Sequence, residues 1–212
     1  MTEPERPLES LLASEQTFIG QIEIHRTDHA FALQHRDDAG RRDLRDYAAE
    51  KAIEIAKLDD AGKYRPLKTA PNLRRGWRIL APDFATAVSV IDAIYPARLA
   101  VWRVWKSGRL SPTPWRQTLA RQSGIYRVAA KISDAQTDEL VGNFCRSDRG
   151  CLRTILWKRD DPGANASTRL PPEKFDPEHD QTGHDRTAIP LLCQEACNLL
   201  VAAARKVAKS EL

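Results

Sequence analysis

Long apolar runs are absent from this sequence of 212 residues, and no apolar segment of the kind found in secretory signals follows its polar first residues. We therefore expect a cytoplasmic protein that enters no membrane, in a compartment that keeps thiols reduced. A strong charge excess is also absent, since the formal net charge is only +4. Nucleic-acid binders concentrate basic residues on one face, so we expect no nucleic-acid partner.

Internal repeats are lacking as well, and the N-terminal half contains no recognisable catalytic motif. The composition, 42% hydrophobic and 29% charged, is that of a globular protein with a buried core. The length allows one large domain or two small ones. The sequence defines neither an oligomeric state nor whether the protein is an enzyme.

The first half alternates predicted strands and helices. Apolar residues at every second position predict a hairpin with a polar turn over residues 26–29. Helical spacing predicts helices over residues 43–58, capped by Asp43, and over 82–94, with a strand over 77–80 between them. We expect three histidines of this region to be exposed side chains rather than metal ligands. They are His25, His29 and His35.

The second half is predicted to be mainly helical. Thr113 is the expected N-cap of a helix that Gly124 interrupts, and a further helix is expected over residues 134–144. The polar loop at 158–189 holds His179 and His184, which we expect to be solvent-exposed. The predicted class is therefore α+β: a small N-terminal α/β layer over residues 1–112, then a mainly helical, cysteine-ligated cluster module over residues 113–212.

Cysteine is scarce, and the four residues present form two short pairs, Cys145-x5-Cys151 and Cys193-x3-Cys197. Four thiolates can hold either a [4Fe-4S] cluster or a tetrahedral zinc ion. The five-residue gap suits structural zinc poorly and favours the cluster, while zinc and four ordinary thiols stay open as alternatives. We expect Cys193 at the start of the last helix and Cys197 one turn inside it, near the positive end of the helix dipole.

Other residues around the cysteines suit a charged cofactor. Apolar side chains after Cys151 would shield one side of it from water: Leu152, Ile155, Leu156 and Trp157. Six arginines also crowd this region, and they could bind a carboxylate-rich substrate, neutralise cluster charge or lie on solvated faces. They are Arg116, Arg121, Arg127, Arg146, Arg149 and Arg153.

The cysteine spacing resembles the iron–sulfur signature of siroheme sulfite and nitrite reductases. That resemblance implies all four cysteines as [4Fe-4S] ligands, with Cys197 as the bridge to a siroheme iron. Three longer stretches also resemble the iron–sulfur module found behind sirohydrochlorin cobaltochelatase-like domains of bacterial proteins, where a stabilising domain precedes the module. These stretches are TPWRQTLARQSGIYRVAAKI, CRSDRGCLRTILW and PLLCQEACNLLVAAARKV.

The resemblances imply an iron–sulfur protein with a redox or accessory role, linked to tetrapyrrole metabolism of the siroheme or cobalamin type. Its expected partner is a redox protein, for electron transfer, or a chelatase-type protein. One alternative is an enzyme that binds a carboxylate-rich tetrapyrrole beside the cluster. The other is a structural zinc module that mediates protein contacts.

Overall fold

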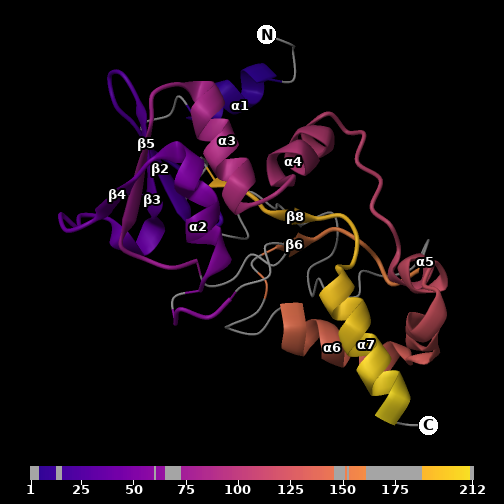
Figure 1. Ribbon diagram of the computed structural model, residues 1–212. Helices are drawn as coiled ribbons and strands as arrows, with labels where there is room; N and C mark the ends of the chain where they lie inside the picture. The colour runs from indigo at the N-terminus through magenta and orange to yellow at the C-terminus, as the bar shows by residue number, and fades with distance from the viewer. Residues whose placement is uncertain are drawn as a thin grey trace. The chain divides into compact units, whose positions relative to one another are not determined.

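The protein is described here by a computed structural model that covers residues 5–12, 16–59, 61–64, 73–145, 151, 153–160 and 188–210. It forms two compact units, shown as a ribbon in Figure 1. The sheet unit comprises Met1–Arg109 with Pro177–Leu191, and the helical unit comprises Leu110–Asp176 with Leu192–Leu212. A mixed sheet with helices, followed by a helical part, confirms the predicted α+β class.

The sheet unit is built on six strands in the order β4-β5-β3-β2-β1-β7. Neighbours in the centre are antiparallel, whereas the two edge pairs, β4–β5 and β1–β7, are parallel. The predicted hairpin is the β2–β3 pair, and a second tight turn at Gly20 adds β1 before it. The strands are β1 (Gln16–Ile19), β2 (Ile22–Arg26), β3 (Phe31–His35), β4 (Arg45–Tyr47), β5 (Trp77–Ala81) and β7 (Ala188–Ile189).

Strand alternation gives this sheet one apolar face and one polar face. Ile24, Leu33 and Ile79 lie opposite one another across the register and are buried. On the other face Glu23 is only 1% exposed, and its carboxylate accepts hydrogen bonds from Gln16 and Gln34, the latter at 2.9 Å. The buried charge is thus fully partnered, as burial requires.

Helices of the sheet unit complete its apolar core. The longest, α3, begins after Asp83, whose carboxylate accepts the Thr86 amide at 2.7 Å. The predicted helix at 82–94 is therefore present, with Asp83 rather than Pro82 marking its start. The helices are α1 (Glu5–Leu12), η1 (Arg36–Asp38), η2 (Ala49–Lys51), α2 (Ala52–Lys57), α3 (Phe84–Ile94) and α4 (Arg98–Lys106), where η marks a 3-10 helix.

The predicted helix over 43–58 is wrong in its first half. Residues Arg45–Tyr47 form β4, and only Ala52–Lys57 form an α-helix. Asp43 does not cap it, because its carboxylate pairs with the Arg41 guanidinium. Pairing with β5 outweighs helical spacing here, since β4 gains a sheet ladder and an ion pair from Asp46 to Arg78 at 2.7 Å.

The prediction that all three strand histidines are exposed fails for His35, which is 1% exposed. Its Nδ1 accepts the Asp37 amide at 3.0 Å, and burial lowers the pKa of the imidazole. His25 lies on the polar face beside Glu23, with 3.2 Å between Nε2 and Oε1. His25 and His35 therefore point to opposite faces of the sheet.

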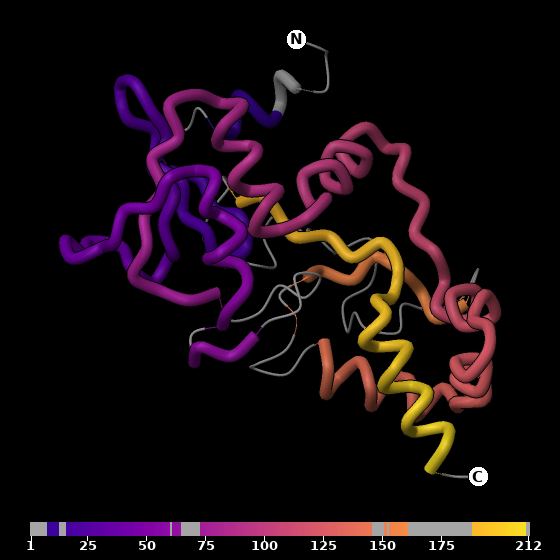
Figure 2. The backbone as a smooth tube through the Cα atoms, viewed as in Figure 1, coloured from indigo at the N-terminus to yellow at the C-terminus, as the bar shows by residue number. Residues whose placement is uncertain are grey.

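The helical unit packs its elements around one apolar core. Its described elements are α5 (Trp115–Ala120), η3 (Gly124–Lys131), α6 (Asp134–Cys145), β6 (Thr154–Ile155), β8 (Leu192–Cys193) and α7 (Asn198–Ser210). The segment after Gly124 is a 3-10 helix, and Pro114 rather than Thr113 occupies the N-cap of α5. The tube in Figure 2 follows the backbone from α5 through η3 into α6.

Membrane-spanning length is not reached by any single helix among the residues that the structure describes. Within the described residues, only α3 and α4 taken together have the length and composition of a membrane span, and the chain bends by 110° between them. Several of their apolar side chains lie in the core. His179 and His184 lie outside the described residues, so their expected exposure stays a prediction.

The β1–β2 turn generates a stability prediction. Gly20 has φ +57°, and a Cβ there would lie 2.6 Å from Leu191 Cδ1 and 3.0 Å from the Tyr95 hydroxyl. Gly20→Ala should therefore lower the free energy of unfolding by about 2–4 kcal/mol, from backbone strain and overpacking together. Gly40→Ala is the matched control, because Gly40 has φ +78° with no atom within 4 Å of its Cβ position.

Urea denaturation of the two variants measures the difference. Gly40→Ala should lose only the strain contribution, about 1 kcal/mol. Equal losses in both variants would mean that Leu191 and Tyr95 do not enclose the turn.

Candidate iron–sulfur site

The two cysteine pairs are joined by the short parallel ladder between β6 and β8. Ile155 lies opposite Cys193 in this ladder, and the Leu156 amide donates to the Cys193 carbonyl at 3.0 Å. Cys151 precedes β6, and its amide reaches the Phe144 carbonyl at 3.4 Å, beside Cys145. All four cysteines consequently belong to the helical unit.

Three of the four thiols share one apolar neighbourhood. Cys193 is buried in the core of the helical unit with Ile155 and Trp157, and the partly buried Cys145 and Cys197 pack against that core. All four described cysteines are thiols rather than disulfides. The predicted shield is present at Ile155 and Trp157, whereas Leu156 is half-buried and Leu152 lies outside the described residues.

The start of the last helix differs from the prediction. α7 begins at Asn198, so Cys193 lies in a strand and Cys197 immediately precedes the helix, where its carbonyl accepts the Val201 amide at 3.1 Å. Pairing with β6 keeps residue 193 extended, and this delays the helix by one turn. Cys197 still lies beside the first-turn amides, at the positive end of the helix dipole.

Backbone and side-chain contacts to α5 and the segment before it hold the loop between Cys193 and Cys197. The Thr113 amide donates to the Gln194 carbonyl at 2.9 Å. The Glu195 carboxylate accepts from Arg121 at 2.7 Å and from Thr118 at 3.3 Å. Sequence reasoning missed Glu195, because nothing in the cysteine spacing signals that a residue between the ligands is anchored elsewhere.

The arginines divide by their partners. Arg116 donates to the Ile132 carbonyl at 2.8 Å and pairs with Asp134, and Arg121 is paired with Glu195. Arg127 is exposed, while Arg146 and Arg149 lie outside the described residues. Only Arg153, among those described, acts on a cysteine, because its positive charge lowers the pKa of Cys193.

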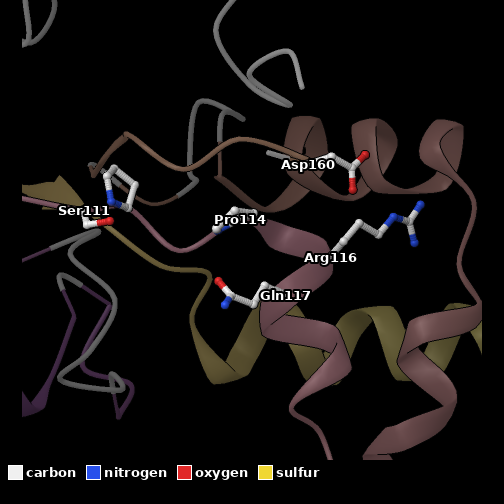
Figure 3. A pocket seen from close by; sticks show the side chains of 6 residues that line it. Ser111, Pro114, Arg116, Gln117 and Asp160 are labelled. Atoms are coloured by element: carbon white, nitrogen blue, oxygen red, sulfur yellow. The ribbon is translucent and has the colours of Figure 1, made fainter. Parts of the chain in front are cut away.

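A concavity of about 290 Å³ lies near the start of α5 (Figure 3). Arg116 and Gln117 project from α5, and Asp160 comes from the segment after β6. The Arg116 guanidinium already binds the Ile132 carbonyl and the Asp134 carboxylate. It is therefore not a free cation that could bind an anionic ligand in this concavity.

Electrostatics within the site is dominated by burial. Burial raises the pKa of Cys193 to about 11, against the opposing effects of the Trp157 N–H and of Arg153. The charges of Cys151 and Cys197 contribute to this rise. The neutral Cys193 thiol donates to the Glu195 carbonyl at 3.2 Å.

Four cysteine thiols are a donor set that suits a [4Fe-4S] cluster. Among the described residues, no three His, Cys, Asp or Glu side chains are placed to hold a metal ion. Sulfurs around one zinc would lie about 3.8 Å apart, given bonds of about 2.3 Å, whereas a cubane spreads its thiolates roughly 6–7 Å apart. Soft thiolates are the ligands that such clusters use, and Cys145, Cys193 and Cys197 lie at the apolar core of the helical unit.

Comparison with known proteins identifies the class first. Residues 107–206 match the family model of a 4Fe-4S iron–sulfur cluster binding domain. Residues 6–106 match the model of the DR2241 stabilising domain. Along this chain a segment that matches the stabilising domain thus precedes one that matches a 4Fe-4S cluster binding domain, which confirms the predicted resemblance.

A particular solved structure matches along nearly the whole chain. It is the crystal structure of DR2241 from Deinococcus radiodurans, a multi-domain protein described as structurally similar to chelatases but with two additional novel domains. The match has a TM-score of 0.76 and 27% identity, and it covers 98% of this chain. This chain spans only 41% of that protein. Among curated proteins, none matches the present chain significantly.

The burial of Cys193 predicts ordered thiol reactivity in the metal-free, reduced protein. Iodoacetamide should modify Cys193 last, because its side chain is 8% exposed while the other three cysteines are partly exposed. With a pKa of about 11, only about one thousandth of this thiol is ionised at pH 8. Its alkylation rate should rise about tenfold from pH 8 to pH 9.

Mass spectrometry of peptides after timed alkylation gives the four rates separately. Circular dichroism at each pH shows whether the fold persists. A Cys193 rate equal to that of Cys197 at pH 8 would contradict the burial.

Proposed function

We propose that the protein binds one [4Fe-4S] cluster through Cys145, Cys151, Cys193 and Cys197. The observation that carries this proposal is the gathering of both cysteine pairs in the unit whose sequence matches a 4Fe-4S cluster binding domain. In this proposal residues 113–212 form the cluster module, and residues 1–112 form the stabilising domain. When bound, such a cluster supplies one-electron redox chemistry.

The chain's own residues would bind and shield the cluster. Ile155 and Trp157 exclude water on the core side, which raises the effect of every nearby charge and dipole. The first-turn amides of α7 face the side where Cys197 lies and favour negative charge there. Arg121 and Thr118 hold the intervening loop through Glu195, so the second ligand pair is positioned before the cluster binds.

The biological role that we propose is electron transfer or an accessory function beside tetrapyrrole chemistry in the cytoplasm. The support is the likeness to a protein described as structurally similar to chelatases. This chain corresponds to 41% of that protein. A redox protein or a chelatase-type protein would be the partner. Direct binding of a carboxylate-rich tetrapyrrole has less support, because Arg116 and Arg121 are already paired with acidic side chains.

Cysteine variants test the ligand set. Each Cys→Ser change at position 145, 151, 193 or 197 should lower the iron bound per protein and weaken the broad visible absorption of thiolate-ligated iron, since each removes one of four ligands. Iron, acid-labile sulfide and zinc are measured after purification without oxygen. Ser123→Ala is the control, because Ser123 lies on the surface of the same unit.

Three outcomes separate the hypotheses. A brown protein with about four irons and four sulfides supports the cluster. A colourless protein that holds one zinc through the same cysteines would establish the zinc module instead. Full iron and an unchanged spectrum in Cys197→Ser would remove Cys197 from the ligand set.

A further inference from the structure

Two buried N–H donors beside Cys193 make no hydrogen bond of ordinary geometry. The indole Nε1 of Trp157 and the guanidinium Nε of Arg153 are both shielded from solvent, and neither has a partner in the described structure. Leaving a buried N–H unpaired costs free energy, so such groups are rare in folded proteins. Six buried side-chain nitrogens lack a partner among the described residues, and these two are the ones that lie near a cysteine in the β6–β8 segment.

The register of the β6–β8 ladder explains why both flank the same sulfur. Ile155 lies opposite Cys193, and Arg153 and Trp157 are the residues two positions before and after it. Both residues flank the two-residue strand β6, within diagonal reach of its partner strand, and Trp157 packs in the same core cluster as Cys193. The Trp157 N–H, as a weak donor outside ordinary hydrogen-bond geometry, and the Arg153 charge both lower the pKa of Cys193, which supports their closeness.

The hydrogen bonding of Cys193 must reverse when the residue becomes a ligand. As a neutral thiol it donates its proton to the Glu195 carbonyl at 3.2 Å. A metal-bound thiolate has no proton and can only accept, so that contact is lost. The sulfur then needs donors, and the two unpartnered N–H groups are already in place.

We infer that Trp157 and Arg153 donate N–H···S hydrogen bonds to the Cys193 sulfur in the cluster-bound protein and thereby raise the reduction potential of the cluster. This inference rests on the proposed function. Donors to a ligating sulfur withdraw charge from it and favour the reduced, more negative state. The Trp157 ring stacks on that of Trp115 with centroids 5.9 Å apart, and a phenylalanine at position 115 keeps an aromatic ring against it.

Trp115 provides a matched control. Its indole N–H donates at 3.1 Å to the Thr137 hydroxyl, away from the cysteines, and its ring is as buried as that of Trp157. Trp157→Phe and Trp115→Phe thus remove the same group from the same core, but only the first removes a proposed donor to sulfur. For the arginine, Arg153→Met is compared with Arg159→Met, since Arg159 pairs with Asp134 and Asp138.

The experiment measures the midpoint potential of the reconstituted cluster by spectroelectrochemistry, with iron and sulfide determined for each variant. Trp157→Phe and Arg153→Met should each shift the potential to lower values than their controls at equal iron content. Resonance Raman spectra in H2O and D2O give a second readout, because an exchangeable N–H···S bond shifts the iron–thiolate stretch. That isotope shift should shrink in Trp157→Phe and persist in Trp115→Phe.

The outcomes separate this inference from the proposed function. An unmodified protein that binds no iron and sulfide overturns both. A bound cluster whose potential and isotope shift are the same in Trp157→Phe and Trp115→Phe overturns the hydrogen bonds alone. If Trp157→Phe does not fold, the isotope shift of Arg153→Met compared with that of Arg159→Met decides: a smaller shift in Arg153→Met supports the inference, and equal shifts overturn it.

Discussion

The pairing of β6 with β8 is the constraint on which the helical unit depends. Two residues on each side suffice to set Ile155 against Cys193, although nearly forty positions separate them in the sequence. The ladder thus joins the segment after the first cysteine pair to the second pair, in addition to the packing of α6 on α7. Because the ladder is parallel, the residues leaving both strands continue in the same direction, and the core forms at one end of it.

Around that ladder, polar contacts lie on the outside and apolar contacts inside. Glu195 faces α5 through Arg121 and Thr118, while Trp115, Trp157 and Leu200 fill the interior. The same division holds in the sheet unit, where buried Asp38 accepts from Gly76 at 2.6 Å and from Arg41 at 2.8 Å. In both units a buried or half-buried carboxylate joins segments that are distant in the sequence.

Long periodic segments were predictable from the sequence, and short pairings were not. Helices α3 and α6 and the β2–β3 hairpin follow from spacing and capping residues that act locally. β4 was not recognised, because Leu44 and Tyr47 fit helical spacing and only the distant strand β5 makes them extended. The extended state of Cys193 was missed for the same reason, since it depends on β6.

The candidate site divides in the same way. The cysteine pairs and the apolar shield could be predicted, because residue type and spacing alone define soft ligands and a dry surface. The roles of Arg153 and Glu195 could not be predicted, because a charged residue near a cysteine in the sequence is equally typical of a solvated side chain. His35 was misjudged because its burial comes from the sheet face on which it lies, which its own neighbours in sequence do not reveal.

Neither unit is a continuous stretch of the chain, and this affects how the protein can fold as it is synthesised. The sheet takes its last strand, β7, from residues 188–189, and β8 of the other unit begins only at Leu192. Until that late segment leaves the ribosome, β1 remains an uncovered edge that is open to pairing with other chains. The strand that closes the sheet and the one that carries Cys193 emerge together, so neither unit is complete until residues 188–193 have been synthesised.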